Sequence, residues 1–230
     1  MSASANRREF LQAASAGAIA ATTLSATAVR AANAASDKLV VGLVGCGGRG
    51  THDANLFKSV PNVELAYACD VDASRRENIA KNLGLPTSRI VSDMRRILDD
   101  KTVDIVIVTT PDHWHSPASI LAVGAGKHVY VEKPISHNIR EGRLLVEAAA
   151  RNKRHVQHGT QCRSTSMMIE AVKQLREGII GTVLVAKCWN IQKRGSIGRG
   201  QDTAPPAGLD YESWIGPATM IPYRTNRVHN

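Results

Sequence analysis

A glycine-rich run directly follows an apolar run near the start of the chain, and together they restrict the folds available to it. Residues 39–44 read LVVGLV and residues 45–50 read GCGGRG, with the spacing G-x-G-x-x-G. At a strand-to-helix turn, Gly45 permits a tight turn, Gly47 lets the backbone approach a pyrophosphate, and Gly50 lets helix and strand pack closely. A glycine-rich turn in another α/β fold is the alternative, so the surrounding sequence has to decide.

The next apolar run ends at a carboxylate. Residues 63–69 read VELAYAC, and Asp70 follows them. In dinucleotide-binding folds an acidic residue at this point hydrogen-bonds the adenosine ribose and disfavours a 2′-phosphate, which favours NAD over NADP. Arg75 and Arg76 lie close enough in sequence to bind such a phosphate, although a solvated helix start also explains them. We therefore expect NAD or NADP as the cofactor, with a modest preference for NAD.

Short β-rich runs alternate with helical patterns as far as residue 157. Strands that are apolar on both faces and alternate with helices predict a parallel sheet covered on both sides, the doubly wound α/β arrangement. The predicted strands cover residues 39–44, 63–69, 103–109, 128–131 and 155–157. The predicted helices cover residues 51–59, 73–83, 94–98, 116–124 and 139–151.

Residues 105–115 read IVIVTTPDHWH, a predicted buried strand that breaks at Pro111 into polar and aromatic residues. Ligands of open α/β sheets bind outside the carboxyl ends of the strands, so this end belongs to the candidate site. His113 and His115 are metal-ligand residue types, but no third ligand stands at a suitable spacing, and we expect no metal. Packing at the start of the next helix is the alternative role for His115.

A charged pair interrupts residues 128–136, HVYVEKPIS, at the end of another predicted strand. Charged side chains beside a buried strand need solvent, a partner or a ligand. This strand end and the motifs above meet at one edge of a parallel sheet, so we expect Lys133 at the ligand site. A lysine ammonium can hydrogen-bond a substrate hydroxyl and stabilise the alkoxide that develops as hydride leaves its carbon.

The stretches GCGGRG, TTPDHWH, VYVEKPIS and HGTQCRS resemble those of the Gfo/Idh/MocA oxidoreductases, which include glucose-fructose oxidoreductase and inositol dehydrogenase. The resemblance covers residues 38–192. It implies that Lys133 is the catalytic lysine, and that Gln161 and Arg163 lie in a stretch that often borders the active site, although packing explains both equally well. The cofactor-binding residues that it implies are Gly45, Cys46, Gly47, Gly48, Arg49, Gly50, Asp70, Thr110, Pro111, His115 and Glu132.

The same resemblance implies a Rossmann domain over residues 38–160, followed by a substrate domain with a mainly antiparallel sheet that often carries the oligomer interface. A helix over residues 167–177 and a strand over residues 182–191 are predicted to begin that domain, and the residues after 195 are Gly- and Pro-rich, which predicts a long surface loop. Family members are usually longer and carry a second catalytic motif, D-x-G-x-H, which is missing here. We therefore expect residues 161–230 to be an incomplete domain with an unpaired strand, and the full-length parent to be a homo-oligomer.

Cysteine spacing and charge disfavour other classes of protein. Cys46, Cys69, Cys162 and Cys188 show no CxxC spacing, which indicates neither a zinc site nor a disulfide framework. The 29 Lys and Arg residues outnumber the 20 Asp and Glu residues. The densest basic run, residues 151–154, falls at a predicted helix end, where cations meet the negative end of the helix dipole. Aromatic residues do not interleave with the basic ones, so we expect no nucleic-acid partner.

Residues 1–34 have the order of an export signal. Arg7 and Arg8 precede an Ala-rich run over residues 11–29 and small residues near Ala34. This order is typical of a twin-arginine signal, a route that carries folded proteins and suits one that acquires its cofactor in the cytoplasm. Polar residues within the run disfavour a stable membrane span. We expect a periplasmic or otherwise exported protein, and a disordered leader on a cytoplasmic protein is the alternative.

Three hypotheses for function follow. The leading one is an NAD(P)-dependent oxidoreductase that acts on a sugar, cyclitol or related polyol. The second is a glycoside hydrolase of the same fold that uses NAD transiently, since one fold hosts several chemistries. The third is a nucleotide-binding module without catalysis, which the missing second motif favours.

Overall fold

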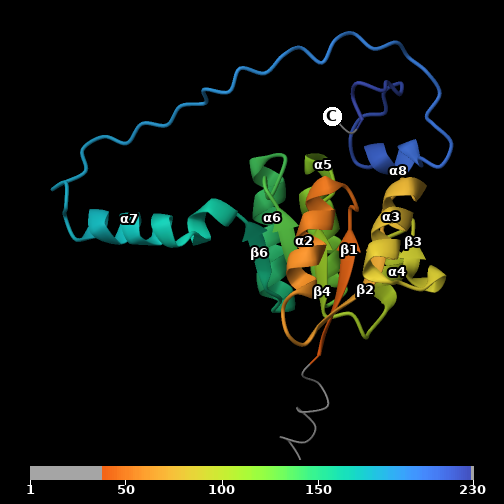
Figure 1. Cartoon of the computed structure of the whole chain (residues 1–230), viewed down its shortest axis with the longest axis horizontal. Helices are drawn as coiled ribbons and strands as arrows, with labels where there is room; N and C mark the ends of the chain where they lie inside the picture. The colour runs from red at the N-terminus through yellow and green to blue at the C-terminus, as the bar shows by residue number, and fades with distance from the viewer. Residues whose placement is uncertain (1–37, 229–230) are drawn as a thin grey trace, which may run out of the picture.

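A six-stranded, all-parallel sheet forms the centre of the protein (Figure 1). The computed structural model describes residues 38–228. Its strands run in the order β3-β2-β1-β4-β5-β6, so the direction of the crossovers reverses between β1 and β4. The predicted doubly wound α/β fold is therefore confirmed. The strands are β1 (Leu39–Val44), β2 (Val63–Cys69), β3 (Ile90–Val91), β4 (Ile105–Val108), β5 (His128–Glu132) and β6 (Val156–Gly159).

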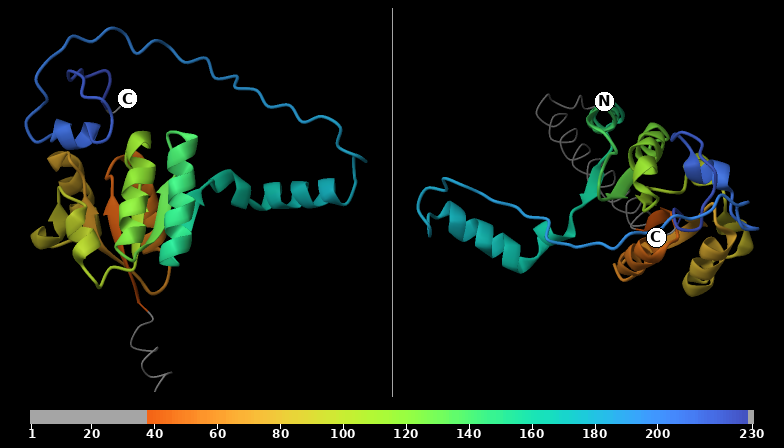
Figure 2. Two further views of the ribbon diagram at one scale, coloured as in Figure 1. Left: turned by 180° about the vertical axis from the view of Figure 1, so that it is seen from behind. Right: turned by 90° about the horizontal axis from the view of Figure 1, so that it is seen from above.

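Helices cover both faces of this sheet (Figure 2). On one face, Val41 and Leu43 of β1 belong to an apolar cluster with residues of α2 and α3. On the other face, Val44 belongs to a second cluster with residues of α4, α5 and α6. Alternate side chains of β1 therefore enter different cores, which is why the strand is apolar on both faces. The helices are α2 (Gly48–Lys58), α3 (Ala73–Leu83), α4 (Arg95–Asp99), α5 (Asp112–Gly124), α6 (Ile139–Asn152), α7 (Ser166–Arg176) and α8 (Tyr211–Ile215).

Polar side chains fix where two of these helices begin. The Asp72 carboxylate accepts the backbone N–H of Ser74 at 2.9 Å, which starts α3 directly after the carboxyl end of β2. The Asn138 side chain accepts the N–H of Glu141 at 3.0 Å and starts α6 after β5. Each cap satisfies a backbone donor that the helix itself cannot satisfy, and contributes about 1 kcal/mol.

Helix α5 and strand β3 differ most from prediction, whereas the bounds of the other predicted elements up to β6 differ by at most three residues. Helix α5 begins at Asp112, four residues before its predicted start, because Pro111 takes the N-cap position and the polar residues that follow form the first turn. The two-residue strand β3, over residues 90–91, was not predicted, because so short a run carries no periodic signal.

The strand predicted over residues 182–191 is wrong: these residues form neither helix nor strand. Apolar side chains such as Val183 and Leu184 are exposed there. A strand is held by hydrogen bonds to a neighbouring strand, and the described part of the chain places no strand beside this one. An antiparallel second domain stays a prediction.

The last described residues return to the sheet instead of forming only a surface loop (Figure 1). Residues 208–228, here named the cap segment, contain α8 and a small apolar cluster of their own. A β-bridge joins Leu209 to Asp72, and the N–H of Asp210 donates to the carbonyl oxygen of Val71 at 3.1 Å. The cap segment therefore docks on the turn after β2, at the carboxyl edge of the sheet.

The predicted export signal, residues 1–34, lies outside the described residues. Within residues 38–228, no helix has both the length and the apolar character needed to cross a membrane.

Candidate functional site

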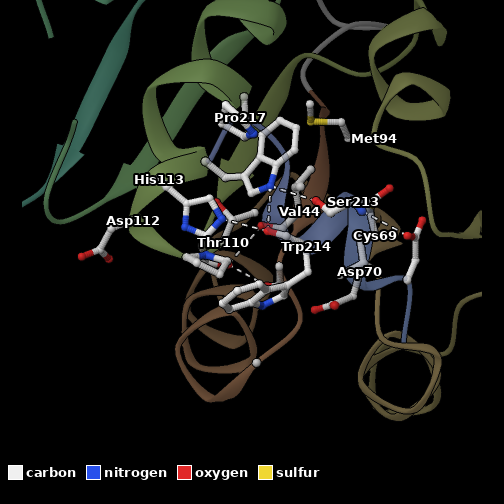
Figure 3. Close-up of a pocket in the computed structure, with 18 of the residues that line it drawn as sticks. Val44, Cys69, Asp70, Met94, Thr110, Asp112, His113, Ser213, Trp214 and Pro217 are labelled. Carbon is white, nitrogen blue, oxygen red and sulfur yellow. Dashed lines mark hydrogen bonds between the residues drawn. The ribbon is translucent and has the colours of Figure 1, made fainter. Parts of the chain in front are cut away.

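The carboxyl ends of β1, β2 and β4 open into one cleft of about 1440 Å³ (Figure 3). It lies at the point where the strand order reverses, which is where open α/β sheets bind their ligands. Its walls come from residues 45–50, here named the glycine loop, and from the ends of β2 and β3, the first half of α5 and the cap segment.

The glycine loop fits tightly against the sheet at both of its ends. Gly45 has a φ of 96°, and a Cβ there would lie 2.6 Å from the backbone of Thr109. A Cβ at Gly50 would lie 1.9 Å from the carbonyl oxygen of Gly45. Only glycine fits at either position, so these residues serve the turn and the helix packing that the motif spacing predicts.

The middle of the loop is open, which fits a bound pyrophosphate. A Cβ at Gly47 would meet only the end of the Arg75 side chain, 2.6 Å from its Nη1. Gly47 also has an ordinary backbone conformation, so packing does not require a glycine here, whereas close approach of a phosphate does. No side chain in residues 38–228 caps the start of α2, which leaves the positive end of that helix to a ligand.

Asp70 stands where the ribose hydroxyls of a dinucleotide are expected. Its carboxylate accepts the N–H of Cys46 at 2.7 Å and the N–H of Asp72 at 2.9 Å. A carboxylate has about four acceptor positions, so two remain for ribose hydroxyls. The residues present therefore fit NAD: the loop and α2 would hold its phosphates, and Asp70 would hold its ribose.

The two arginines that follow Asp70 take different positions. Arg75 lines the cleft beside Gly47, with its Nε 3.7 Å from a carboxylate oxygen of Asp72. Arg76 donates from Nη1 to the backbone carbonyl of Asp70 at 3.0 Å. Arg75 thus adds a cation beside the phosphate loop, and Arg76 supports the turn that carries Asp70.

Thr110 and Pro111 line the cleft at the end of β4, whereas His115 is buried, with 2% of its surface exposed. The His115 Nδ1 lies 2.6 Å from the carbonyl oxygen of Pro134, and its Nε2 lies 2.8 Å from that of Thr110. His115 therefore joins the loops after β4 and β5, and its geometry supports the packing role.

Glu132 is also buried and faces the protein. Its carboxylate lies 2.9 Å from the guanidinium of Arg49, accepts the N–H of Lys133 at 3.1 Å and contacts the amide of Gln161. Arg49 forms a second ion pair with Asp53, also at 2.9 Å. This network joins the glycine loop to the end of β5. Its contact with Gln161 supports the packing role of that residue. The Arg49 guanidinium therefore pairs with two carboxylates of the protein, whereas the resemblance implied a contact with the cofactor.

Burial raises the pKa of the Asp53 carboxyl, and the charge of Glu132 raises it further, while Arg49 opposes both effects. Burial likewise raises the pKa of the Cys46 and Cys69 thiols above the ordinary range. Both cysteines are free and buried, so they behave as small core residues rather than nucleophiles.

Lys133 is exposed, directly after the carboxyl end of β5, and it is not among the residues that line the cleft. The peptide bond to Pro134 is cis. Within the described residues, the Lys133 ammonium has no ion-pair or hydrogen-bond partner, so it is available to a ligand. No group of three or more His, Cys, Asp or Glu side chains that could hold a metal ion occurs in that same part of the chain.

Sequence reasoning missed the contribution of the cap segment to the cleft. Asp210, Ser213 and Trp214 line it together with His113 and Trp114 of α5 (Figure 3). Two aromatic residues between Gly208 and the Gly-Pro pair at 216–217 were the available signal, since an aromatic pair in a Gly- and Pro-rich segment indicates local packing.

Comparison with known proteins identifies the family. The Gfo/Idh/MocA model, described as an oxidoreductase family with an NAD-binding Rossmann fold, matches residues 39–160. A glycosyl hydrolase family 109 protein of Saccharopolyspora erythraea is 31% identical over 157 residues, which are 65% of this chain and 34% of that protein. An alpha-N-acetylgalactosaminidase of Shewanella oneidensis is 28% identical over 205 residues, which are 78% of this chain and 44% of that protein.

A solved structure supports the same assignment. The WlbA dehydrogenase of Chromobacterium violaceum, in complex with NADH and UDP-GlcNAcA, is 29% identical with a TM-score of 0.57, over 63% of this chain and 41% of that one. The chain thus spans between a third and a half of the length of these proteins. The match over more than half of its residues means that the chain belongs to the Gfo/Idh/MocA oxidoreductase family and carries its NAD-binding Rossmann domain.

Proposed function

We propose that this chain is the nucleotide-binding part of an NAD-dependent oxidoreductase that acts on a sugar, cyclitol or related polyol. The observation that carries the proposal is the ion pair between Arg49 and Glu132. It ties the glycine loop, which would hold the cofactor phosphates, to the end of β5, so that the exposed Lys133 lies on the same carboxyl edge of the sheet as the cleft.

Bound NAD would supply the hydride acceptor. The substrate alcohol would be oxidised to a ketone, with the hydrogen on its carbon leaving as the hydride and its hydroxyl proton passing to solvent. Lys133 hydrogen-bonds the hydroxyl oxygen and stabilises its developing negative charge. Glu132 acts indirectly, because it accepts the backbone N–H of Lys133 and holds that residue at the strand end.

A glycoside hydrolase that oxidises and re-reduces its sugar is the second candidate. The names of the curated relatives favour it, since they include a glycosyl hydrolase family 109 protein and an alpha-N-acetylgalactosaminidase. The same lysine and the same hydride acceptor serve its first step. The overall reaction of such an enzyme would consume no oxidant, so no reduced cofactor would accumulate.

Two assays run together separate these candidates. The complete natural protein is mixed with NAD or NADP and a panel of sugars and polyols, and reduced cofactor is followed by fluorescence; aryl glycosides are tested in parallel for release of the aryl alcohol. Substrate-dependent fluorescence supports the oxidoreductase, and aryl release without it supports the hydrolase. Silence in both assays, with cofactor binding intact, contradicts both and leaves a nucleotide-binding module.

We also propose that the protein is exported through its twin-arginine leader, Arg7 and Arg8. The arginine pair before an Ala-rich run supports this, and a route that carries folded proteins suits a protein that acquires its cofactor in the cytoplasm.

A further inference from the structure

The cap segment holds an aromatic residue of α5 in place. The Nε1 of Trp114 donates to the carbonyl oxygens of Ser213 at 3.0 Å and Trp214 at 3.2 Å. The Nε2 of the neighbouring His113 lies 2.8 Å from the same Trp214 carbonyl, and the two rings meet edge to face at 5.4 Å. The orientation of the Trp114 indole is therefore fixed by a segment about 100 residues away in sequence.

Gly216 of the cap segment shows how closely that segment fits the indole. A Cβ at this position would lie 2.2 Å from the Trp114 ring. Gly216 also has a φ of 53° and a ψ of −117°, a conformation that residues with a side chain rarely adopt. The indole and the turn at Gly216 therefore fit together only because glycine stands there.

Trp114 stands at the end of the cleft where the adenine base of the cofactor is expected. Asp70, at the end of β2, would hold the adenosine ribose, and the next strand outward in the sheet is β3. The residues after β3 line this end together with the first half of α5. The apolar side chains that line it are Met94, Leu98, Trp114, Ala118 and Leu121.

This end of the cleft has the chemistry of a site for a planar base. Leu121 is 50% exposed although it belongs to the cleft wall, so its apolar surface gains from being covered. An indole offers a broad, rigid face on which a base stacks. The cap segment closes the cleft from the other side, with Pro217 and Ser213 among the residues around it (Figure 3).

We propose that Trp114, held by the cap segment, is the stacking platform for the adenine ring of the cofactor. The inference rests on the proposed function, because it takes the cleft to be the cofactor site. The ligand class is an adenine nucleotide, and the nicotinamide end makes no contact with this platform.

The test is calorimetric titration of the 230-residue chain with NAD, AMP and nicotinamide mononucleotide, with unfolding temperature measured for each variant. Trp114→Ala should weaken AMP and NAD binding about tenfold and leave nicotinamide mononucleotide unchanged, because only the adenine ring loses its stacking partner. Gly216→Val should have the same effect by displacing the indole. Trp189→Ala is the matched control, since that tryptophan is 70% exposed and lies outside the cleft.

A second readout covers the case in which Trp114→Ala does not fold. In Trp214→Phe, which removes the other tryptophan side chain of the cleft, AMP should quench the tryptophan emission, and adding Trp114→Phe should keep AMP binding while most of that quenching is lost. AMP affinity within about twofold of the unaltered chain in Trp114→Ala, or undiminished quenching in the double variant, overturns the platform but leaves the proposed function standing. An unaltered chain that binds neither NAD nor AMP overturns both.

Discussion

The carboxylate of Glu132 lies 2.9 Å from the guanidinium of Arg49, and this contact joins the two halves of the candidate site. Arg49 comes from the glycine loop, and Glu132 comes from the end of β5, next to Lys133. The Glu132 side chain is 5% exposed and that of Arg49 is 39% exposed, so one partner is buried and the other reaches the cleft. The ion pair therefore links two segments of the protein, although both residues belong to motifs that predicted ligand contacts.

Replacing Glu132 should destabilise the protein. Glu132→Gln keeps the shape of the side chain but removes its charge, and we expect a loss of about 1–3 kcal/mol in the free energy of unfolding by urea. Arg49→Met combined with Glu132→Gln should cost less than the sum of the single changes, because each single change already breaks the pair. Glu64→Gln, which breaks an exposed pair with Lys38, is the control and should change stability by less than about 1 kcal/mol. Additive losses would contradict the coupling.

Gly47 should be needed for the cofactor and not for folding. We expect Gly47→Val to weaken NAD binding at least about tenfold by calorimetry, because its side chain would occupy the space of the pyrophosphate. The unfolding temperature should change little, since the new Cβ meets only the end of Arg75.

Two further glycine variants serve as controls for Gly47→Val. Gly195→Val, at a position where a Cβ meets nothing within 4 Å, should alter neither property. Gly50→Ala should instead destabilise the fold, because its Cβ would lie 1.9 Å from the carbonyl oxygen of Gly45. Loss of folding in Gly47→Val would assign that glycine to structure.

Lys133 should affect turnover alone. Lys133→Met should lower substrate-dependent reduction of NAD, or aryl glycoside cleavage, by about 10²- to 10⁴-fold, because the developing alkoxide loses its hydrogen-bond donor. NAD affinity and unfolding temperature should stay unchanged, because the ammonium is exposed and has no partner within the described residues. Lys101→Met, at another exposed lysine, is the control. Full turnover in Lys133→Met would remove this residue from the mechanism.

Stability at low pH should depend on Asp100. Its carboxylate accepts hydrogen bonds from the hydroxyl and N–H of Thr102, from Tyr67 and from Arg89, and these bonds lower the pKa of the carboxyl. A lowered pKa in the folded state stabilises the protein above the ordinary pKa of about 3.9, and the effect is lost as the pH falls through the folded-state value.

Asp100→Asn should therefore lower the free energy of unfolding by about 1–3 kcal/mol at neutral pH. The difference from the unaltered chain should shrink as the pH falls below the ordinary Asp value. Asp99→Asn, an exposed neighbour, should have little effect at any pH. A difference that does not depend on pH would mean that the hydrogen bonds do not act through the charge of the carboxylate.

The leader gives a prediction about location. Changing both Arg7 and Arg8 to Lys should keep the protein in the cytoplasmic fraction, because the twin-arginine route requires the arginine pair. Arg30→Lys, in the same leader, should leave export unchanged. Export is measured by cell fractionation and immunoblotting. Equal export of the Arg7 and Arg8 double variant and of Arg30→Lys would refute this route.

The sequence alone determined the parallel sheet, the glycine loop and the position of Asp70. Each of these depends on residues that are adjacent in the chain: the apolar run over residues 39–44, the spacing of the glycines after it, and the acidic residue that ends β2. Strand periodicity and turn chemistry are local properties, so a single sequence reports them directly.

Only the tertiary structure decided how the site is closed. Arg49 and Glu132 are 83 residues apart, and Trp114 is about 100 residues from the carbonyls that hold it. The motifs around these residues predicted ligand contacts for Arg49 and Glu132 and nothing for the cap segment. Whether a buried charge meets a ligand or another side chain depends on which distant segments the fold brings within hydrogen-bond distance, and no local pattern encodes that distance.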